Sequence, residues 1–281
     1  MDKNKKNLDV REKEMQLQEK YKLLKKQIQE YESLCVAFSG GVDSTFLLFV
    51  AYNVLGNRTM AITVRSSMYP KRELKEAEEF AKKLGVHHFC IDANEYSIPE
   101  FVQNDKERCY YCKKAIFTKI QESAKKFGIN QVADGSNGDD TFDYRPGMRA
   151  IKELQVVSPL KEAGLTKEEI RILSKEEGLP TWDKPSMACL ASRIPYGTAI
   201  TPEQLLQVEE GENYLLQQGF TQFRVRHHGN LARIEVSPHE QEKFFQPDFV
   251  QELVAYFKKI GYLYVTLDLQ GYRTGSMNEV L

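Results

Sequence analysis

The chain has 281 residues, of which 39 are basic and 40 are acidic, so its formal charge is −1. This length and an apolar content of 41% allow two ordinary domains, each with its own core. The near-neutral charge argues against a nucleic-acid partner, and no segment has the roughly 20 consecutive apolar residues that cross a bilayer. Because the N-terminus also has no apolar signal-peptide stretch, we expect a cytoplasmic protein that binds no membrane.

The first expected element is a helix over residues 9–32. Its apolar residues follow one narrow stripe at alternating spacings of four and three, which is typical of an amphipathic helix. The stripe consists of Leu17, Tyr21, Leu24, Ile28 and Tyr31. It has two interpretations, packing on the helix's own domain or a coil between subunits.

Strands and helices then alternate along the chain. Strands are expected at 34–38, 60–64, 87–91, 131–134 and 156–160, and helices at 45–55, 69–84, 113–127 and 166–177. Thr166 is placed to cap the last of these helices. This alternation predicts an α/β fold with a doubly wound parallel sheet. Ligands of such sheets bind at the carboxyl ends of the strands, where the loop after residue 38, the strand end at Val64 and the loop at Asp134 would converge.

A second domain is expected after the proline-rich residues 180–200. The following elements are a helix at 203–218, strands at 223–226 and 232–236, a helix at 248–260 and a strand at 262–269. Their order suggests a small C-terminal α+β domain. We therefore divide the chain into an N-terminal helix (1–32), a doubly wound domain (33–185) and a C-terminal domain (186–281).

The segment Ser39-Gly40-Gly41-Val42-Asp43-Ser44 joins the first expected strand to a helix. Such a loop directs backbone N–H groups and the positive end of a helix dipole at one point, which predicts phosphate binding. It is not a Walker loop, because the chain has no Gly-x4-Gly-Lys-Ser/Thr. An ordinary strand–helix turn is the alternative, but Ser39, Asp43 and Ser44 make the segment resemble the SGGxDS loop of the N-type ATP pyrophosphatases.

Those enzymes split ATP between the α and β phosphates and adenylate a substrate. The resemblance implies that loop N–H groups and serines hold the departing pyrophosphate, and that Asp43 binds Mg²⁺ or orients the loop. The candidate ATP-binding residues are Ser39, Gly40, Gly41, Val42, Asp43, Ser44, Val64, Asp134, Gly135 and Asn137.

Three of the five cysteines have a spacing that suggests chemistry. Cys109 and Cys112 form a C-x-x-C, and Cys189 lies in the expected boundary segment. Three thiolates could bind three irons of a 4Fe–4S cluster, but a zinc or redox site and unconnected thiols remain open on spacing alone. Cys35 and Cys90 lie inside expected strands, where we expect small buried hydrophobic residues.

Several further segments together resemble the LarE family of ATP-dependent sulfur transferases, which serve synthesis of the nickel-pincer nucleotide cofactor of lactate racemase. The matching segments are Ala37–Ser44, Asp134–Asn137 with Asp140, Asp143–Gly147, Trp182–Pro185, Cys189–Gly197 and Arg224–Arg226. They span nearly the whole chain, and the segments at Cys189 and at Tyr144-Arg145-Pro146-Gly147 are the most selective.

The resemblance implies an enzyme that adenylates a carboxylate of pyridinium-3,5-biscarboxylic acid mononucleotide and replaces its oxygen with sulfur. Cys189 matches the sulfur-donor position, which makes Cys189, Asp43 and Ser44 the candidate catalytic residues. One branch of the family sacrifices this cysteine's sulfur. Cys109 and Cys112 instead make this chain resemble the branch whose three cysteines hold a 4Fe–4S cluster carrying an extra sulfide. The family also implies a homohexamer.

A nucleotide that carries a phosphate and two carboxylates requires donors such as arginine. The candidate substrate-binding residues are Arg145, Arg149, Ser192, Arg193, Arg224, Arg226 and Glu235. Arg224 and Arg226 alternate along a strand and so face one side, although a solvated strand face would give the same pattern. Glu235 and Asp140 could balance these charges or bind Mg²⁺, and Asp140 is the candidate to join Asp43 at the Mg²⁺ site.

Other functions fit part of the same pattern. A tRNA thiolation enzyme would pair the pyrophosphate loop with C-x-x-C cysteines, but the charge is near neutral. An amide-forming ligase of the NAD or GMP synthetase type would leave the cysteines unused. A non-catalytic ATP or iron–sulfur sensor would bind ATP without releasing pyrophosphate.

Overall fold

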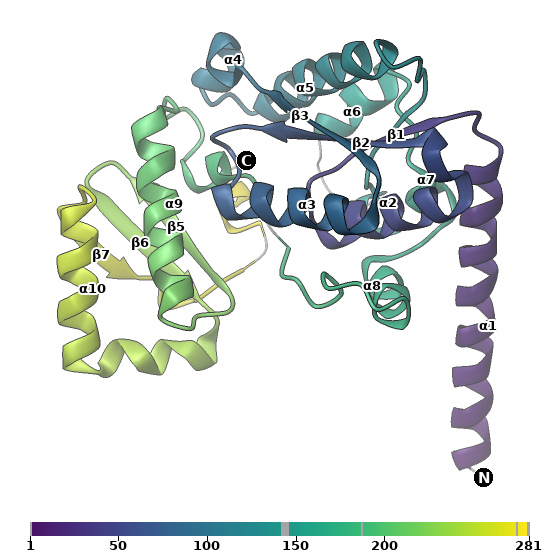
Figure 1. Ribbon diagram of the computed structural model, residues 1–281. Coiled ribbons are helices and arrows are strands. Elements are labelled where there is room, and N and C mark those ends of the chain that lie inside the picture. The colour runs from purple at the N-terminus through teal and green to yellow at the C-terminus, as the bar shows by residue number, and fades with distance from the viewer. Residues whose placement is uncertain (1, 142–145, 187, 274, 280–281) are drawn as a thin grey trace. The chain divides into compact units, whose positions relative to one another are not determined.

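Figure 1 shows the computed structural model, which describes residues 2–141, 146–186, 188–273 and 275–279. Two compact units make up the chain, and each is described by itself. Unit 1 consists of Met1–Arg65, Lys71–Ala93 and Cys109–Ser186, and unit 2 of Ser66–Pro70, Asn94–Arg108 and Met187–Leu281. Among the described residues no helix is long and apolar enough to cross a membrane.

Unit 1 is built on a four-stranded parallel sheet with the order β3-β2-β1-β4. The strands are β1 (Leu34–Ala37), β2 (Thr59–Arg65), β3 (His87–Asp92) and β4 (Val132–Ala133). The parallel α/β fold expected from the sequence is confirmed. The expected fifth strand at 156–160 is wrong, because only a single bridge joins Val157 to Ala133 and a short helix begins at Pro159. Proline has no N–H to donate to a strand ladder.

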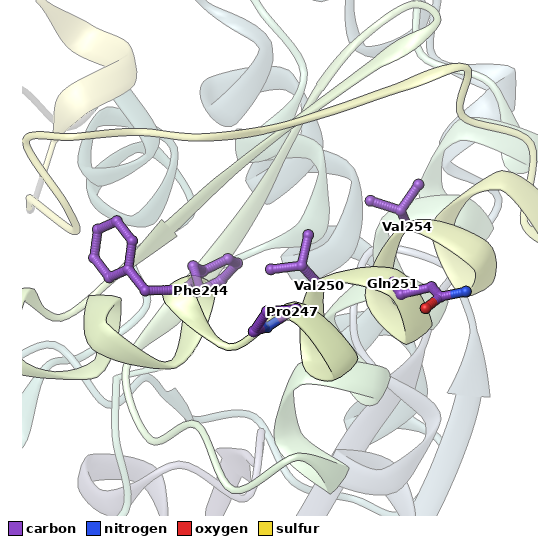
Figure 2. A pocket seen from close by; sticks show the side chains of 6 residues that line it. Phe244, Pro247, Val250, Gln251 and Val254 are labelled. Carbon is purple, nitrogen blue, oxygen red and sulfur yellow. The ribbon is translucent and has the colours of Figure 1, made fainter.

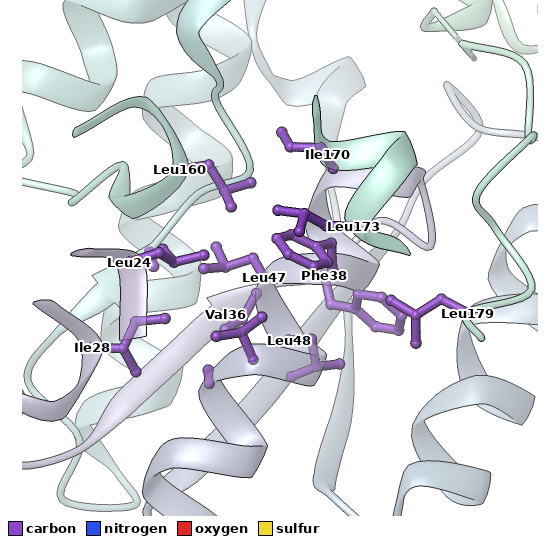
Figure 3. Close-up of a cluster of buried hydrophobic side chains, with 14 of the residues drawn as sticks. Leu24, Ile28, Val36, Phe38, Leu47, Leu48, Leu160, Ile170, Leu173 and Leu179 are labelled. Carbon is purple, nitrogen blue, oxygen red and sulfur yellow. The ribbon is translucent and has the colours of Figure 1, made fainter. Parts of the chain in front are cut away.

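Helices cover both faces of this sheet (Figure 1). The helices are α1 (Asp2–Gln29), α2 (Val42–Leu55), α3 (Lys71–Leu84), α5 (Arg108–Lys125), α6 (Pro146–Glu153), α7 (Pro159–Glu162) and α8 (Lys167–Glu176). Alternate residues of β1 point to opposite faces, so Val36 packs with α1, α2, α7 and α8 while Cys35 packs with α5 and α6. Figure 3 shows the first of these clusters, where Phe38 and Leu47 meet Leu173.

The apolar stripe of α1 is used within unit 1. Leu17, Tyr21, Leu24 and Ile28 are buried in the cluster around α2, and the Tyr21 hydroxyl donates to Glu177 at 2.7 Å. The interpretation that the helix packs on its own domain is therefore confirmed. The helix begins at Asp2, earlier than expected, and residues 11–16 are exposed where its first half extends away from the rest of the unit (Figure 1).

Unit 2 contains a three-stranded sheet with the order β5-β6-β7. The strands are β5 (Phe223–His228), β6 (Leu231–Val236) and β7 (Tyr264–Leu267), and the helices are α4 (Pro99–Val102), α9 (Pro202–Gln217) and α10 (Pro247–Lys259). β5 and β6 are antiparallel, whereas β6 and β7 are parallel because α10 connects them. The expected order of helices and strands after residue 200 is confirmed.

A depression of about 500 Å³ lies at the start of α10 (Figure 2). Its lining residues are Phe244, Phe245, Pro247, Val250, Gln251 and Val254. None of these side chains is charged, so this surface is unsuited to an anionic nucleotide.

Two short segments join unit 2 from loops that follow β2 and β3. Glu95 is buried and accepts hydrogen bonds from the Ser66 hydroxyl and the Ser67 amide, both at 2.9 Å. The Leu190 amide donates to the Met68 carbonyl at 2.8 Å. These contacts place the segment after β2 beside the segment that carries Cys189.

Candidate active site

The loop between β1 and α2 is shaped by its two glycines. Gly40 has a φ of +72°, and a Cβ there would lie 3.1 Å from the Ala77 Cβ. Gly41 is the N-cap of α2, and no side chain caps the helix. Among the described residues no side chain therefore blocks the N–H groups of the first helical turn, which are the groups that bind anions at a helix N-terminus.

Ser39 and Ser44 hold the loop together. Their hydroxyl oxygens are 3.0 Å apart, and the Ser39 amide donates to the Ser44 Oγ at 3.3 Å. The Ser44 hydroxyl in turn donates to the Gly41 carbonyl at 3.3 Å. Both hydroxyls thus lie at the helix N-terminus, where they can turn toward a phosphate.

The loop after β4 contacts the first loop at Gly135. A Cβ on Gly135 would lie 3.1 Å from the Ser44 nitrogen, so a side chain there would displace the pyrophosphate loop's backbone. Asp134 is buried and accepts hydrogen bonds from the Ser136 and Ser158 hydroxyls, which makes it a support for this loop. Val64 instead packs in the cluster on the α5 side of the sheet.

Asp43 contacts residues of two other segments of unit 1. One carboxylate oxygen forms an ion pair with Lys167, and the other accepts from the Asn137 amide at 3.3 Å. The Asn137 backbone N–H donates to Asp140 at 2.9 Å, so Asn137 links the two aspartates. The sequence did not single out Lys167, the first residue of α8.

Magnesium is implied by the loop's resemblance, and the donor set fits it. Mg²⁺ usually takes one or two carboxylates and completes its shell with water and phosphate oxygens. Asp43 and Asp140 supply that number of carboxylates. Among the described residues no group of three or more His, Cys, Asp and Glu side chains is arranged as a metal site. In the structure the positive charge beside Asp43 is the Lys167 ammonium.

Lys184, in the matched segment Trp182–Pro185, also reaches the loop. Its ammonium donates to the Gly40 carbonyl at 3.2 Å and pairs with Glu73 at 2.6 Å. Arg171 holds this segment by donating to the carbonyls of Trp182 and Lys184, both at 2.6 Å. The resemblance of this segment to the family did not predict that Lys184 contacts the loop.

The C-x-x-C lies inside a helix rather than before one. The expected start of this helix at residue 113 is wrong, because α5 begins at Arg108. Cys109 and Cys112 therefore stand three residues apart on one face of its first turn, with Cys109 exposed and Cys112 buried. In unit 2, Cys189 is half-buried and precedes a short 3-10 helix, Leu190–Arg193.

Arg193 is fully buried and holds the backbone around Cys189. Its guanidinium pairs with Glu212 at 2.8 Å and donates to the carbonyls of Ala188 and Cys189 at 2.7 and 3.0 Å. Burial pushes the pKa of Glu212 up, but the charge and hydrogen bonds of Arg193, with help from Arg224, outweigh burial and leave this pKa below its ordinary value. Glu212 is therefore ionised at neutral pH.

Arg224 and Arg226 are both buried, which excludes the solvated strand face. Arg226 pairs with Glu235 at 2.7 Å, while its buried Nε has no hydrogen-bond partner among the described residues. Arg224 lies over the Tyr272 ring at 4.9 Å, and its burial, followed by the nearby Arg193 charge, lowers its pKa. Glu235 balances charge as expected. This part of unit 2 is a buried, cationic polar cluster.

The remaining candidates divide between the units. Arg149 belongs to unit 1, where its guanidinium lies over the Tyr110 ring at 3.9 Å beside the C-x-x-C. Ser192 accepts a hydrogen bond from Arg193 at 2.9 Å in unit 2. Arg145 lies outside the described residues.

Comparisons with known proteins identify the family of this chain. Residues 33–180 match the family described as the arginosuccinate synthase N-terminal HUP domain. The chain is 44% identical to an uncharacterized protein of Synechocystis sp. over 94% of this chain and 99% of that protein. It is 35% identical to the pyridinium-3,5-bisthiocarboxylic acid mononucleotide synthase of Lactiplantibacillus plantarum over 90% of this chain and 92% of that enzyme. The chain belongs to the LarE family.

Membership places the chain among the ATP-dependent sulfur transferases of the N-type ATP pyrophosphatase superfamily. A more distant similarity extends to the argininosuccinate synthase of Methanocaldococcus jannaschii, at 30% identity over 52% of this chain and 40% of that enzyme. That partial match agrees with the HUP domain being the part that the wider superfamily shares. The LarE relative, in contrast, extends through the segments of Cys189 and Arg224–Arg226.

Proposed function

We propose that this enzyme adenylates a carboxylate of pyridinium-3,5-biscarboxylic acid mononucleotide, releases pyrophosphate, and replaces the carboxylate oxygen with sulfur for nickel-pincer nucleotide synthesis. The observation that carries the proposal is the match, over nearly the whole chain, to a synthase named for the bisthiocarboxylic product. The pyrophosphate loop at the carboxyl end of β1 supports the adenylation half of this reaction.

In the first step a substrate carboxylate oxygen attacks the α-phosphorus of ATP, and the bond to the β-phosphate oxygen breaks. The loop N–H groups, Ser39 and Ser44 are placed to stabilise the charge that develops on the leaving pyrophosphate. Asp43 and Asp140 would hold Mg²⁺, which supplies further positive charge when bound. Lys167 adds a cation beside the same loop.

In the second step a sulfur nucleophile attacks the acyl carbon, and AMP leaves with the original carboxylate oxygen. We propose that Cys189 marks the sulfur-donor position and that Cys109, Cys112 and Cys189 hold a 4Fe–4S cluster. Support comes from Cys109 and Cys112, whose thiols lie on one face of the first turn of α5. When bound, such a cluster supplies sulfide.

The anionic groups of the substrate would bind to the buried polar cluster of unit 2. Arg226 has a buried Nε without a partner among the described residues, and an incoming phosphate or carboxylate oxygen would satisfy it. Burial and the Arg193 charge lower the pKa of Arg224, and a bound anion would stabilise the charged form of this guanidinium. Ser192, Arg193 and Glu235 complete this proposed subsite, and Arg145 and Arg149 remain proposed contacts on the other unit.

The deciding experiment incubates the protein with ATP, Mg²⁺ and the dicarboxylate nucleotide without oxygen. We expect AMP and pyrophosphate in equal amounts, together with a nucleotide whose mass shows an oxygen-to-sulfur exchange. Mass spectrometry of the protein distinguishes the two donors, because a sacrificial Cys189 becomes dehydroalanine whereas a cluster-bound sulfide leaves Cys189 intact. ADP as the sole nucleotide product would contradict the proposal.

We also propose a homo-oligomer, on the resemblance to the family alone. The apolar stripe of α1 does not support it, because that stripe is buried within its own unit. Light scattering after size-exclusion chromatography tests the proposal, and a single monomeric peak at micromolar concentration contradicts it.

A further inference from the structure

Asn104 is a fully buried residue that hydrogen-bonds to the segment after Cys189. Its side-chain N–H groups donate to the carbonyl of Pro195 at 2.7 Å and to that of Ile194 at 3.3 Å. Its own carbonyl accepts from the Gly197 amide at 3.1 Å. Its φ of +56° is one that asparagine tolerates better than most residues.

Arg108, four residues later in the chain, hydrogen-bonds to the same segment. Its Nη1 donates to the Ala191 carbonyl at 3.0 Å and to the Asn104 Oδ1, and its guanidinium lies over the Tyr196 ring at 4.8 Å. Because the Asn104 oxygen accepts from Arg108, the Asn104 nitrogen must face the chain after Cys189. The two side chains therefore act together on three carbonyls between residues 191 and 195.

This arrangement is costly for a role in packing alone. Arg108 is only 6% exposed and is the first residue of α5, where the helix dipole disfavours a cation. The contacts described for its guanidinium are all with neutral groups and include no ion pair. An apolar side chain would fill the same space at lower cost, but it could not fix the orientation of peptide carbonyls.

The segment bound by Asn104 and Arg108, residues 191–195, connects the proposed sulfur donor to the proposed substrate subsite. Cys189 lies two residues before Ala191, and Arg193 lies two residues after it. Arg193 donates to the carbonyls of Ala188 and Cys189. Arg193 thus holds the backbone at Cys189 itself, and Asn104 and Arg108 hold the chain that follows it.

We propose that Asn104 and Arg108 are positioning residues that orient the Cys189 segment for sulfur transfer without taking part in adenylation. The assignment rests on the proposed function for its consequence in catalysis. The structural part of the proposal is that two side chains fix this segment, and this part can be measured without an activity assay.

The test compares Arg108→Ala, Arg108→Lys and Asn104→Gly with wild type. Glycine at 104 keeps the left-handed backbone conformation and removes only the amide side chain. Arg58→Ala is the matched control, since Arg58 also donates to backbone carbonyls, those of Tyr31 and Glu32, but lies in unit 1. All variants are first checked for folding by circular dichroism.

For Arg108→Ala and Asn104→Gly we expect pyrophosphate release to stay within about twofold of wild type, while the rate of sulfur transfer falls by on the order of 10- to 100-fold with KM for the nucleotide nearly unchanged. Added guanidinium ion should partly restore sulfur transfer to Arg108→Ala, and methylammonium should not, because only the planar ion reproduces the fork of donors. The control Arg58→Ala should behave as wild type.

A second readout needs no activity. Hydrogen exchange at Gly197 and Ile200, whose amides donate to the carbonyls of Asn104 and Val102, should be faster in Arg108→Ala and Asn104→Gly, and alkylation of Cys189 should change in the same variants. If wild type releases no pyrophosphate, the proposed function fails while these measurements still decide the positioning role. Unchanged exchange and alkylation, or an equal loss of both half-reactions without rescue by guanidinium, would overturn the proposal. Should Arg108→Ala not fold, Arg108→Lys and Asn104→Gly carry the same test.

Discussion

At the scale of single residues, the pair formed by Asp43 and Lys167 brings opposite charges together at the loop between β1 and α2. Asp43 would repel a polyphosphate if it stood alone. Lys167 neutralises it, and Asn137 fixes its second oxygen at 3.3 Å. Binding of a metal to Asp43 would release the ammonium toward the phosphates, so both residues should matter for the leaving group.

We expect Asp43→Ala to abolish pyrophosphate release, with a loss of about 3 kcal/mol or more of transition-state stabilisation. Lys167→Met should slow it on the order of 100-fold, as removal of one preorganised charge does elsewhere. A coupled pyrophosphate assay measures both. Lys20→Met is the control, because Lys20 pairs with Glu169 of the same helix at 2.7 Å but does not reach the loop. Equal loss in Lys20→Met and Lys167→Met would indicate a role in folding only.

The buried pair of Arg193 and Glu212 gives a prediction about stability. Glu212→Gln would leave the Arg193 charge buried without its carboxylate, which should lower the free energy of unfolding by about 3–5 kcal/mol. Replacing both residues, as Arg193→Met with Glu212→Leu, should cost less than Glu212→Gln, because the hydrogen bonds to the Ala188 and Cys189 carbonyls are lost but no unpaired charge is left buried. Urea unfolding measures these differences, and a double variant no more stable than Glu212→Gln would contradict the electrostatic explanation.

The same carboxylate sets a pH dependence. Burial raises the pKa of Glu212, but the Arg193 charge and hydrogen bonds outweigh it, so the folded pKa is depressed. A depressed pKa contributes stability above the unfolded value of about 4.3, and that contribution disappears as pH falls through the folded pKa. The difference in stability between wild type and Glu212→Gln should therefore be constant at neutral pH and shrink only in acid.

At the scale of elements, local sequence patterns correctly predicted the strands, loops and helix starts that residues close in sequence determine. The apolar run and glycines around residues 34–44 predicted a strand, loop and helix, which are β1 and α2. Thr166 predicted a helix start, and its capping box with Glu169 is present. The expected start of α5 is wrong, because the buried apolar residues of the helix are spaced regularly only from Phe117 onward, whereas Arg108 and Cys109 are already helical.

Features that depend on distant contacts had no local signal. Residues 66–70 and 94–108 belong to unit 2 because groups such as Glu95, Ser66 and Met68 bond across long stretches of chain. Lys167 was missed for the same reason. A lysine at a helix start is ordinary in sequence, and only the fold brings it to Asp43.

The position of the C-x-x-C on α5 predicts an order of thiol reactivity. Cys109 is exposed whereas Cys112 is buried, so iodoacetamide should label Cys109 first. Burial raises the pKa of Cys35 to about 12, and burial with a hydrogen bond to Glu78 raises that of Cys90 to about 11. Since the thiolate is the reactive form, these two should label slowest in folded protein. Peptide mapping after brief alkylation measures the order, and rapid labelling of Cys90 would contradict it.

At the scale of the whole molecule, the near-neutral charge predicts that this enzyme does not act on tRNA. Nucleic-acid binding depends on an excess of cations that displace counterions from phosphates. This chain has 39 basic and 40 acidic residues, and several of its cations are already paired inside the fold. Such pairs include Lys184 with Glu73, Arg193 with Glu212 and Arg226 with Glu235.

We therefore expect tRNA neither to bind at micromolar protein and physiological salt nor to stimulate pyrophosphate release, whereas the dicarboxylate nucleotide should stimulate it. Filter binding over a range of salt concentrations, with pyrophosphate release measured in parallel, tests both statements. The buried arginines of unit 2 give the physical reason. A phosphate and two carboxylates on a small nucleotide can enter a buried polar cluster, but a duplex RNA backbone cannot. Salt-dependent tRNA binding accompanied by tRNA-stimulated pyrophosphate release would instead assign the chain to tRNA thiolation.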